Sequence, residues 1–253
     1  MPRRAAAPKA DVPYLHAKQI EAEADLLIAE YGERYDLVVA PPIPVDELAE
    51  LHLQLTLEYL DMQSLFPNAD VHGAIWFEDG RIGIEQSLDP DSNPNRQGRY
   101  HFTLAHEIGH WRLHRTYYLK NPHDRRLFDD GTSRPDVVCR SGDTQPVEWQ
   151  ANAFAANLLM PRQMVQAAWT EFRDGDDHPV AIDKLREMFA DVMDVEPLYH
   201  RGRVATDQAS QDIAMKEEFC RPLADRFEVS REAMRIRLEQ LGLLVLKKEN
   251  TLF

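Results

Sequence analysis

Hydrophobic positions in the first part of the chain recur at helical spacing, after a segment that has no periodicity. Residues 1–17 are rich in alanine, proline and basic side chains, so we expect a flexible tail there. From Ala17 to about Tyr31 the apolar residues recur every three or four positions. A similar pattern opens in the stretch IPVDELAE. The pattern therefore predicts two amphipathic helices before the middle of the chain.

The next hydrophobic positions alternate with polar ones, which is typical of strands rather than helices. This holds for LQLTLEYL and for VHGAIWFEDGRIGIEQS, which are rich in β-branched and aromatic residues. The pair Asp79-Gly80 separates two short runs of the second stretch and is typical of a hairpin turn. We therefore expect a small sheet, and an extended peptide could add to an exposed edge of the sheet that contains residues 72–87.

Helical spacing returns after the strand patterns, from about residue 100 onward. It covers the stretch around HFTLAHEIGHWRLH and then PVEWQANAFAANLLMP, which Pro146 and Pro161 bound. Between them, residues 120–146 are rich in proline, glycine and charge, and we expect a long surface loop. Residues 171–217 carry many acidic side chains around one helical pattern, so we interpret them as an acidic connector.

The segment 218–253 reads as two short helices joined by a turn. In LADRFEVSREAMRIRLEQLGLL the turn falls at Glu228-Val229, and Ser230 can cap the second helix. This is a helix-turn-helix-like pattern in which Arg231, Arg235 and Arg237 would lie on the second helix, where DNA-binding proteins place their contacts. The alternative is that these helices support the preceding domain or dock a protein substrate.

Composition limits the classes of binding partner and the cellular compartment that we expect for this chain. The 253 residues carry a formal net charge of −14, which argues against bulk attraction to nucleic acid or to anionic membranes. The two cysteines are far apart in the sequence, so they predict neither a disulfide framework nor a thiolate metal cluster. No stretch resembles a signal sequence or a membrane span. We therefore expect a cytoplasmic protein without membrane contact.

The motif H-E-x-x-H at positions 106–110 is the strongest chemical signal in the sequence. His106 and His110 are four residues apart on an expected helix, so both imidazoles can reach one metal ion. Glu107 points about a quarter-turn away and is placed to act on a water at the same ion as a general base. The motif also lies within an apolar helical frame, which favours a buried site over a chance match in a surface loop.

The remaining histidines of the motif do not complete the ligand set. His114 lies about 12 Å from His106 along a straight helix and His101 lies off its face, so both are expected to support or pack. A catalytic zinc site needs a third protein ligand, and Glu148 on the second apolar helix is the best candidate. Position alone leaves open that Glu148 is an exposed residue of the first helical turn.

These residues resemble the ImmA/IrrE family of metallopeptidases. The resemblance rests on GRYHFTLAHEIGHWRLH, VEWQANAFAANLLMPR and LADRFEVSREAMRIRLEQLGLL, in that order. It implies His106, His110 and Glu148 as ligands, Glu107 as catalytic base, and a zinc ion, although manganese or iron would also accept these ligands. Asn152 matches a recurrent family position, and we expect it and His114 to orient the ligands through hydrogen bonds.

The resemblance also sets the expected fold, domains and activity. We expect an α+β fold with a small zincin-like sheet, an H-E-x-x-H helix and packed helices over residues 18–170, before the connector and the helix-turn-helix-like segment. The expected function is a zinc-dependent endopeptidase that cuts a partner protein, of which a helix-turn-helix repressor is the class favoured, and so releases stress-response or mobile-element genes. The alternative is a DNA-binding regulator whose metal site is sensory or structural. The sequence fixes neither the scissile bond, the metal, the oxyanion donor, the activating signal nor the oligomeric state.

Overall fold

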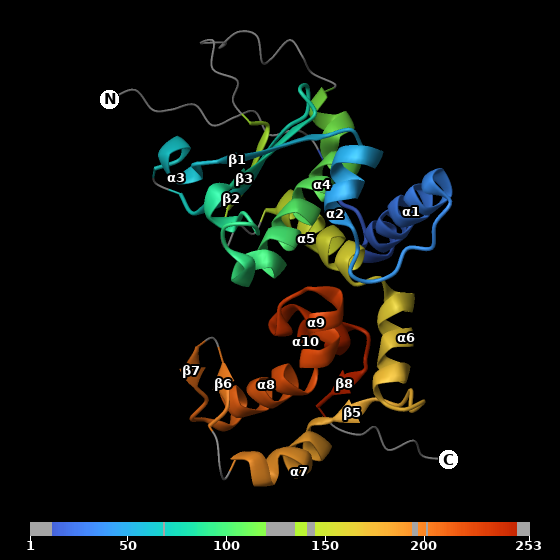
Figure 1. Ribbon diagram of the computed structural model, residues 1–253, viewed down its shortest axis with the longest axis vertical. Helices are drawn as coiled ribbons and strands as arrows, with labels where there is room; N and C mark the ends of the chain where they lie inside the picture. Colours follow the sequence, from blue (N-terminus) through green and yellow to red (C-terminus); the bar gives the residue numbers. More distant parts are fainter. Residues whose placement is uncertain are drawn as a thin grey trace. The chain divides into compact units, whose positions relative to one another are not determined.

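The computed structural model describes two compact units of the chain (Figure 1). The first is Met1–Leu159 and the second is Met160–Phe253. Described residues are 12–67, 69–119, 135–140, 145–193, 197–200 and 202–246. Within that part of the chain, no helix combines the length and apolar character that a membrane crossing requires.

The first unit is a mixed α+β structure, as expected from the alternation of helical and strand patterns. Its elements in order are α1 Ala17–Tyr35, α2 Val45–Glu47, a π-helical turn Leu48–His52, β1 Thr56–Leu60, α3 Met62–Leu65, β2 Val71–Trp76, β3 Arg81–Glu85, short 3-10 turns at Gln86–Leu88 and Pro94–Arg96, α4 Gln97–Leu119, β4 Val137–Arg140 and α5 Pro146–Leu159. The prediction of the first helix is confirmed, and the helix runs four residues beyond the expected end.

The sheet has the order β1-β3-β2-β4. Strands β2 and β3 form the expected antiparallel hairpin, and the turn between them ends at Gly80, whose φ of 61° suits glycine. β1 pairs parallel to β3, and β4 pairs antiparallel to β2. Both strands of the hairpin are therefore interior to the sheet, so an added peptide strand would meet β1 or β4 rather than residues 72–87.

β4 lies inside the segment that we expected to be one long loop. The run Val137, Val138 and Cys139 is short, its two valines are β-branched, and it pairs with β2. Most of the rest of that segment, residues 120–134 and 141–144, lies outside the described residues. The expectation of a loop across 120–146 was therefore wrong at β4, because pairing with an existing strand can order a run too short to be recognised alone.

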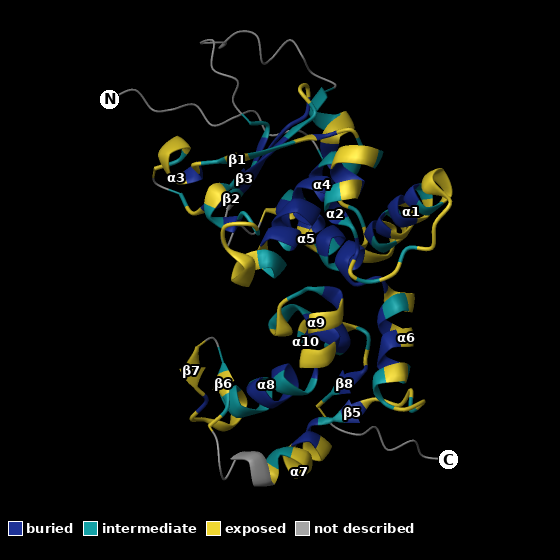
Figure 2. Ribbon diagram, viewed as in Figure 1, coloured by how far each residue is buried: buried dark blue, intermediate teal, exposed yellow. Residues whose placement is uncertain are grey.

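Helices α4 and α5 are the buried centre of the first unit (Figure 2). α4 packs on one face of the sheet, and α5 packs against both α4 and α1. Gly109 lets α4 and α5 approach closely, since a β-carbon there would lie 3.1 Å from Phe154 Cδ1 and 3.3 Å from Ala151 Cα. The two apolar helical patterns of the sequence thus face each other across a glycine contact.

The N-terminal segment before α1 is described only from residue 12. Tyr14 stacks on Trp149 of α5, with ring centroids 5.8 Å apart. The carbonyl of Pro13 accepts a hydrogen bond from Gln150 Nε2. The part of the expected flexible tail at residues 1–11 lies outside the described residues.

The second unit consists of short helices and two-stranded pairings. Its elements are α6 Arg162–Phe172, β5 Val180–Ala181, α7 Ile182–Met193, β6 Tyr199–His200, β7 Arg203–Val204, α8 Gln208–Phe219, α9 Arg221–Phe227, α10 Arg231–Gln240 and β8 Leu244–Val245. Residues 171–217, which we interpreted as a connector, carry α7, the β6-β7 pair and most of α8. The turn between α9 and α10 passes through Glu228 at φ 52°, and Ser230 caps α10 by accepting from the Ala233 N–H.

Candidate metal centre

Three side chains from two helices meet at one buried point of the first unit. His106 and His110 of α4 bring their Nε2 atoms to 2.9 Å from each other. Glu148, in the first turn of α5, places Oε2 3.2 Å from His106 Nε2 and Oε1 3.4 Å from His110 Nε2. Both histidines are fully buried and Glu148 is 3% exposed. The sequence position of Glu148 left open that it is an exposed residue of the first helical turn, and its burial excludes that alternative.

The spacing of these donor atoms fits a tetrahedral divalent ion. Zinc binds imidazole nitrogen and carboxylate oxygen at about 2.0–2.2 Å, so neighbouring ligand atoms should lie about 3.3–3.5 Å apart. The two contacts to Glu148 fall close to this range, and the contact between the two nitrogens is slightly shorter. Two imidazoles and one carboxylate are also the ligand types of catalytic zinc sites. The donor set can therefore hold such an ion while leaving a fourth position for water or substrate.

The Nδ1 atoms of His106 and His110, which face away from the metal centre, have hydrogen-bond partners that set the tautomers of the two rings. Asn152 Oδ1 lies 3.0 Å from His106 Nδ1, so that nitrogen carries the proton. His110 Nδ1 lies 2.9 Å from His114 Nδ1, and His114 Nε2 lies 3.2 Å from Gln150 Oε1. When His110 donates to His114, His114 donates to Gln150 and Gln150 donates to the Pro13 carbonyl, each donor in this series of hydrogen bonds has an acceptor. This arrangement leaves both Nε2 lone pairs pointing at the metal centre.

Burial and neighbouring groups shift the pKa values of the two central carboxylates, Glu148 and Glu107, in opposite directions. Burial raises the pKa of Glu148, but the adjacent side chains of His106 and His110 more than offset it and lower the pKa to about 2. The pKa of Glu107 rises well above its usual value because the group is buried and because Glu148 is negative. Burial lowers the pKa of His110 to about 4. The centre therefore holds an ionised Glu148 beside a neutral His110, which is the protonation state of metal ligands.

Glu107 lies next to the three donor residues without a hydrogen-bond partner of its own. It is fully buried, and neither carboxylate oxygen meets a donor in the described part of the chain. Its carboxylate packs on the backbone of Gly73 in β2, where an added β-carbon would lie 2.4 Å from Oε1. A buried carboxylate without a partner is costly, so this position indicates a group kept for water or substrate.

Sequence reasoning missed three residues of this centre. Cys139 of β4 lies in a cluster with His106 and Glu148, in which one ligand atom from each residue falls within 4.8 Å of the other two. Gln150 ends the hydrogen-bond chain of the histidines, and Gly73 makes room for Glu107. The signal in the sequence that could have identified Gln150 is a polar amide within the largely apolar stretch PVEWQANAFAANLLMP. Nothing in the sequence placed Cys139 or Gly73 beside the motif.

Other histidines and cations near the motif lie apart from the centre. His101 packs beside Tyr100 one turn earlier on α4, with ring centroids 5.7 Å apart. Arg112 points to α1, where it donates to Glu23 and Glu30 at 2.8 Å each. These contacts hold α4 against α1 and leave His101 and Arg112 out of the ligand set.

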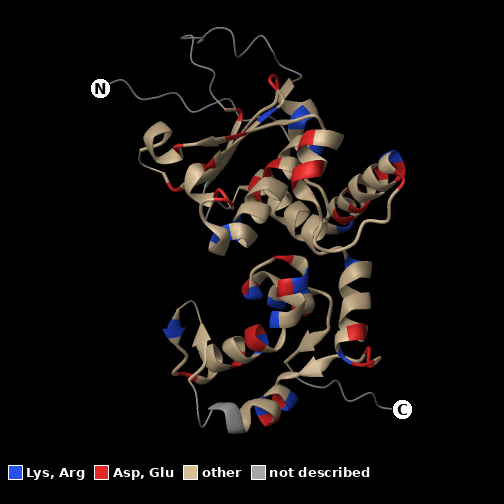
Figure 3. Cartoon of the chain, viewed as in Figure 1, with Lys and Arg blue, Asp and Glu red and all other residues tan. Residues whose placement is uncertain are grey.

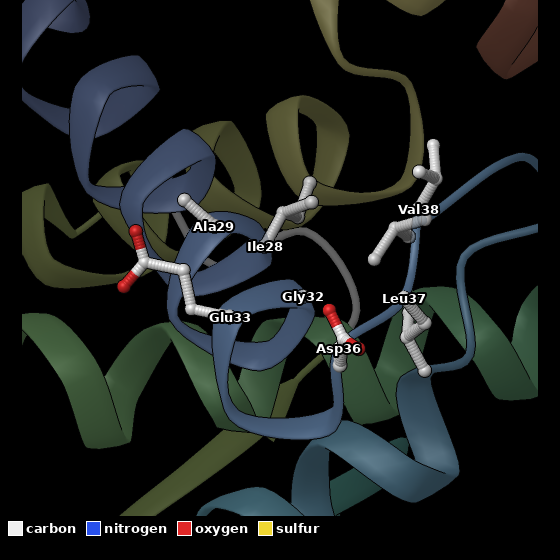
Figure 4. Close-up of a pocket in the computed structure, with 8 residues that line it drawn as sticks. Ile28, Ala29, Gly32, Glu33, Asp36, Leu37 and Val38 are labelled. Atoms are coloured by element: carbon white, nitrogen blue, oxygen red, sulfur yellow. The ribbon is translucent and has the colours of Figure 1, made fainter.

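A hollow on the first unit lies beside α1 and is not the metal centre (Figure 4). Ile28, Leu37 and Val38 line it, and Val38 is 96% exposed. A second, polar hollow is lined by His72, Glu85 and other residues. Neither hollow is lined by the metal-centre residues, so neither identifies the reacting site.

Comparison with known proteins adds one finding. Residues 91–190 match the model of peptidase family M78, described as the IrrE N-terminal-like domain. No curated protein matches the chain. The matched range includes α4, β4 and α5, and therefore every donor residue described above.

Proposed function

We propose that this chain, whose residues 91–190 match the IrrE N-terminal-like domain of the metallopeptidases of family M78, is a zinc-dependent endopeptidase that cuts a partner protein. The observation that carries the proposal is the meeting of His106 Nε2, His110 Nε2 and the Glu148 carboxylate, with the unpartnered Glu107 beside them. Manganese or iron would accept the same ligands.

In the proposed reaction, the ion would supply Lewis acidity toward the scissile carbonyl and the attacking water. Glu107 takes one proton from that water as its oxygen bonds to the carbonyl carbon. The same carboxyl group then passes the proton to the amide nitrogen as the C–N bond breaks, which gives a new carboxyl terminus and a new amine. The raised pKa of Glu107 makes its carboxylate a stronger base toward the water than an exposed glutamate would be.

Asn152, His114 and Gln150 act by holding the ligands rather than by touching substrate. Asn152 fixes the ring of His106, and the His114-Gln150 pair fixes the ring of His110. Hydrogen-bonded partners of this kind keep the metal-binding nitrogens deprotonated and aimed at the ion.

The substrate we propose is a protein, with a helix-turn-helix repressor as the favoured class, so that cleavage derepresses stress-response or mobile-element genes. An extended peptide would reach the centre by pairing with β4, the edge strand that carries Cys139 next to the donor residues. Strand addition binds through the backbone and so presents a peptide bond with little demand on side chains.

The second candidate is a DNA-binding regulator, and the arginines of α10 bear on it. Arg231 contacts Glu218, Arg235 contacts Glu217 and Glu239, and Arg237 is buried with its Nε donating to the Met160 carbonyl. Acidic and basic residues alternate over this region (Figure 3). Cations already paired with carboxylates contribute little to phosphate binding, so these contacts favour a supporting or protein-docking role for the second unit.

The test is to load the purified chain with zinc, or separately with manganese, and to incubate it with the repressor-like protein encoded beside it. We expect a single cleavage whose new termini are mapped by mass spectrometry. Glu107→Gln should retain its metal and lose cleavage, whereas Glu148→Gln should lose metal as well. Glu187→Gln, on the exposed face of α7, is the matched control and should cut at the wild-type rate.

Two outcomes would contradict the proposal. Cleavage by Glu107→Gln at the wild-type rate would exclude this residue as the base. Sequence-specific DNA binding in a mobility-shift assay, with no proteolysis of any offered protein, would favour the regulator.

A further inference from the structure

We propose that Cys139 is a fourth ligand of the metal ion, and that its thiolate closes the coordination position needed by the attacking water. The inference rests on the proposed function, because it requires an ion between His106, His110 and Glu148. In this resting form the peptidase is inhibited by its own edge strand. A substrate strand that pairs with β4 and draws the sulfur away would open the site.

The sheet register brings the sulfur to the metal centre. Cys139 is paired with Gly73 across β4 and β2, and cross-strand partners point to the same face of a sheet. The α4 face is the one on which Glu107 packs against Gly73. Cys139 therefore points to the motif, and its ligand atom lies within 4.8 Å of ligand atoms of His106 and Glu148.

A second observation also indicates that a ligand binds beside Cys139. Glu107 is fully buried, its two oxygens lack hydrogen-bond partners, and its carboxylate packs on the backbone of Gly73, the residue paired with Cys139. The base, carried by α4, and the thiol, carried by β4, thus both lie next to Gly73 at one side of the donor set. The position that Glu107 needs for its water is the position within reach of the sulfur.

The chemistry of the four groups fits a closed zinc site. Zinc binds thiolate sulfur at about 2.3 Å and imidazole nitrogen at about 2.0–2.1 Å, so sulfur and nitrogen on one tetrahedral ion lie about 3.6 Å apart. Because the ligand atoms lie within 4.8 Å of one another, the thiol reaches such a position by moving no more than about 1 Å. On binding, the S–H bond breaks, the sulfur pair bonds to zinc and the proton leaves to solvent. A site with four protein ligands is of the structural type, whereas loss of the sulfur restores the catalytic type.

The two cysteines of the chain provide a matched pair for a test. Cys139 is half-buried in β4, whereas Cys220 is fully buried in the second unit and belongs to no metal-binding cluster of the described residues. Neither forms a disulfide. A signal that depends on Cys139 and not on Cys220 therefore reports this site.

The experiment replaces zinc by cobalt(II) in the full-length protein and records the absorption spectrum. We expect visible bands typical of tetrahedral cobalt together with a near-ultraviolet band from sulfur-to-cobalt charge transfer. Cys139→Ala should lose the charge-transfer band and keep the visible bands, and Cys220→Ala should keep both. A charge-transfer band that persists in Cys139→Ala, or is missing from the wild type, would overturn the inference.

A second readout follows the thiol itself. Zinc should slow alkylation of Cys139 by iodoacetamide by about tenfold or more, because a metal-bound thiolate is withdrawn as a nucleophile. An unchanged rate with bound zinc would contradict the proposal, and this measurement does not depend on how well Cys139→Ala folds. Removal of the sulfur should also raise the cleavage rate of the zinc protein rather than lower it.

Failure of this inference is distinguishable from failure of the proposed function. Protein that binds cobalt at one site without a sulfur band retains the metal centre and lacks only the inhibitory ligand. Protein that binds no cobalt or zinc, measured by metal analysis after dialysis, would remove both.

Discussion

The carboxylate of Glu107 occupies the space that a side chain on Gly73 would fill. A β-carbon on Gly73 would lie 2.4 Å from Glu107 Oε1 and 2.9 Å from the methyl group of Thr103. The position of the proposed base therefore depends on a missing side chain in the neighbouring strand, not only on the helix that carries the motif.

Gly73→Ala should remove most of the activity without removing the metal. The added methyl group would push Glu107 from its position, and a general base contributes about 10²- to 10⁴-fold to the rate. We expect kcat to fall by about 100-fold while the zinc content stays near one per chain. The measurement is peptide cleavage together with metal analysis of the same sample.

Gly83→Ala is the control for a general destabilisation of the sheet. An added β-carbon at Gly83 would lie 2.7 Å from Leu60 Cδ1 and 3.1 Å from Trp76, so it also strains the sheet, but it does not touch Glu107. If both alanine variants lose activity in proportion to their loss of stability, the special role of Gly73 is excluded.

Gly109→Ala should weaken metal binding by moving α5 away from α4. Alanine favours a helix over glycine by about 1 kcal/mol, whereas overpacking a core costs about 1–3 kcal/mol. Its β-carbon would lie within 3.3 Å of Phe154 and of the Ala151 backbone, so the second effect should win. Zinc titration should show a weaker Kd, because Glu148 is carried by the displaced helix.

Phe154→Ala gives a way to check the cause. It removes the Cδ1 atom that the new β-carbon would meet at 3.1 Å, so the double variant should bind zinc more tightly than the sum of the two single effects predicts. Effects of the two substitutions that simply add would show that Gly109 acts independently of this contact.

The sequence was informative about the metal centre where the pattern is local. The four-residue spacing of His106 and His110 defines one helical face, and the apolar frame of α5 identifies a second buried helix, so the meeting of both was predictable. Glu148 was less so, because a first-turn glutamate is equally typical of an exposed helix start. Only packing against α4 decides between these readings.

Other features could not be obtained from the sequence because they depend on long-range pairing. β4 is four residues long, and its position next to Gly73 follows from the sheet register, which sequence spacing does not specify. The arginines of α10 were correctly placed on a helix, but their carboxylate partners Glu217 and Glu218 lie on α8. Charge counting along one segment overlooks such neutralisation.

Gln150→Leu should lower the affinity for zinc while leaving all three proposed ligands in place. The substitution removes the acceptor of His114 Nε2, so the hydrogen-bond chain no longer fixes the proton on His110 Nδ1. Loss of such a partner typically costs about 10- to 100-fold in metal affinity. Competition with a chromophoric chelator would measure this change, and the exposed Gln163→Leu is the matched control. Equal affinities of the two variants would show that the chain does not orient His110.

The metal-free protein should lose stability as the pH falls from about 6.5 toward 4. Burial lowers the pKa of His110 to about 4 and that of His114 to about 3, whereas both would titrate near 6.5 in the unfolded chain. Between these values each of the two imidazoles binds a proton in the unfolded chain and not in the folded one. The raised pKa of Glu107 acts in the opposite direction, but it concerns one proton against two, so acid favours unfolding. The lowered pKa of Glu148, about 2, adds a further loss only below about pH 4.5.

One pKa unit corresponds to about 1.4 kcal/mol, so the shift of His110 alone is on the order of 3 kcal/mol. Melting temperatures of the metal-free protein, taken from pH 8 to pH 4, would show the decline. His114→Gln should make it shallower, since it retains an acceptor for His110 but cannot bind the extra proton. His178→Gln, at a histidine 82% exposed, should leave the slope above pH 4.5 unchanged. A melting temperature that stays constant between pH 7 and pH 5 would mean that these imidazoles are not buried in neutral form, and the proposed ligand state would fail with it.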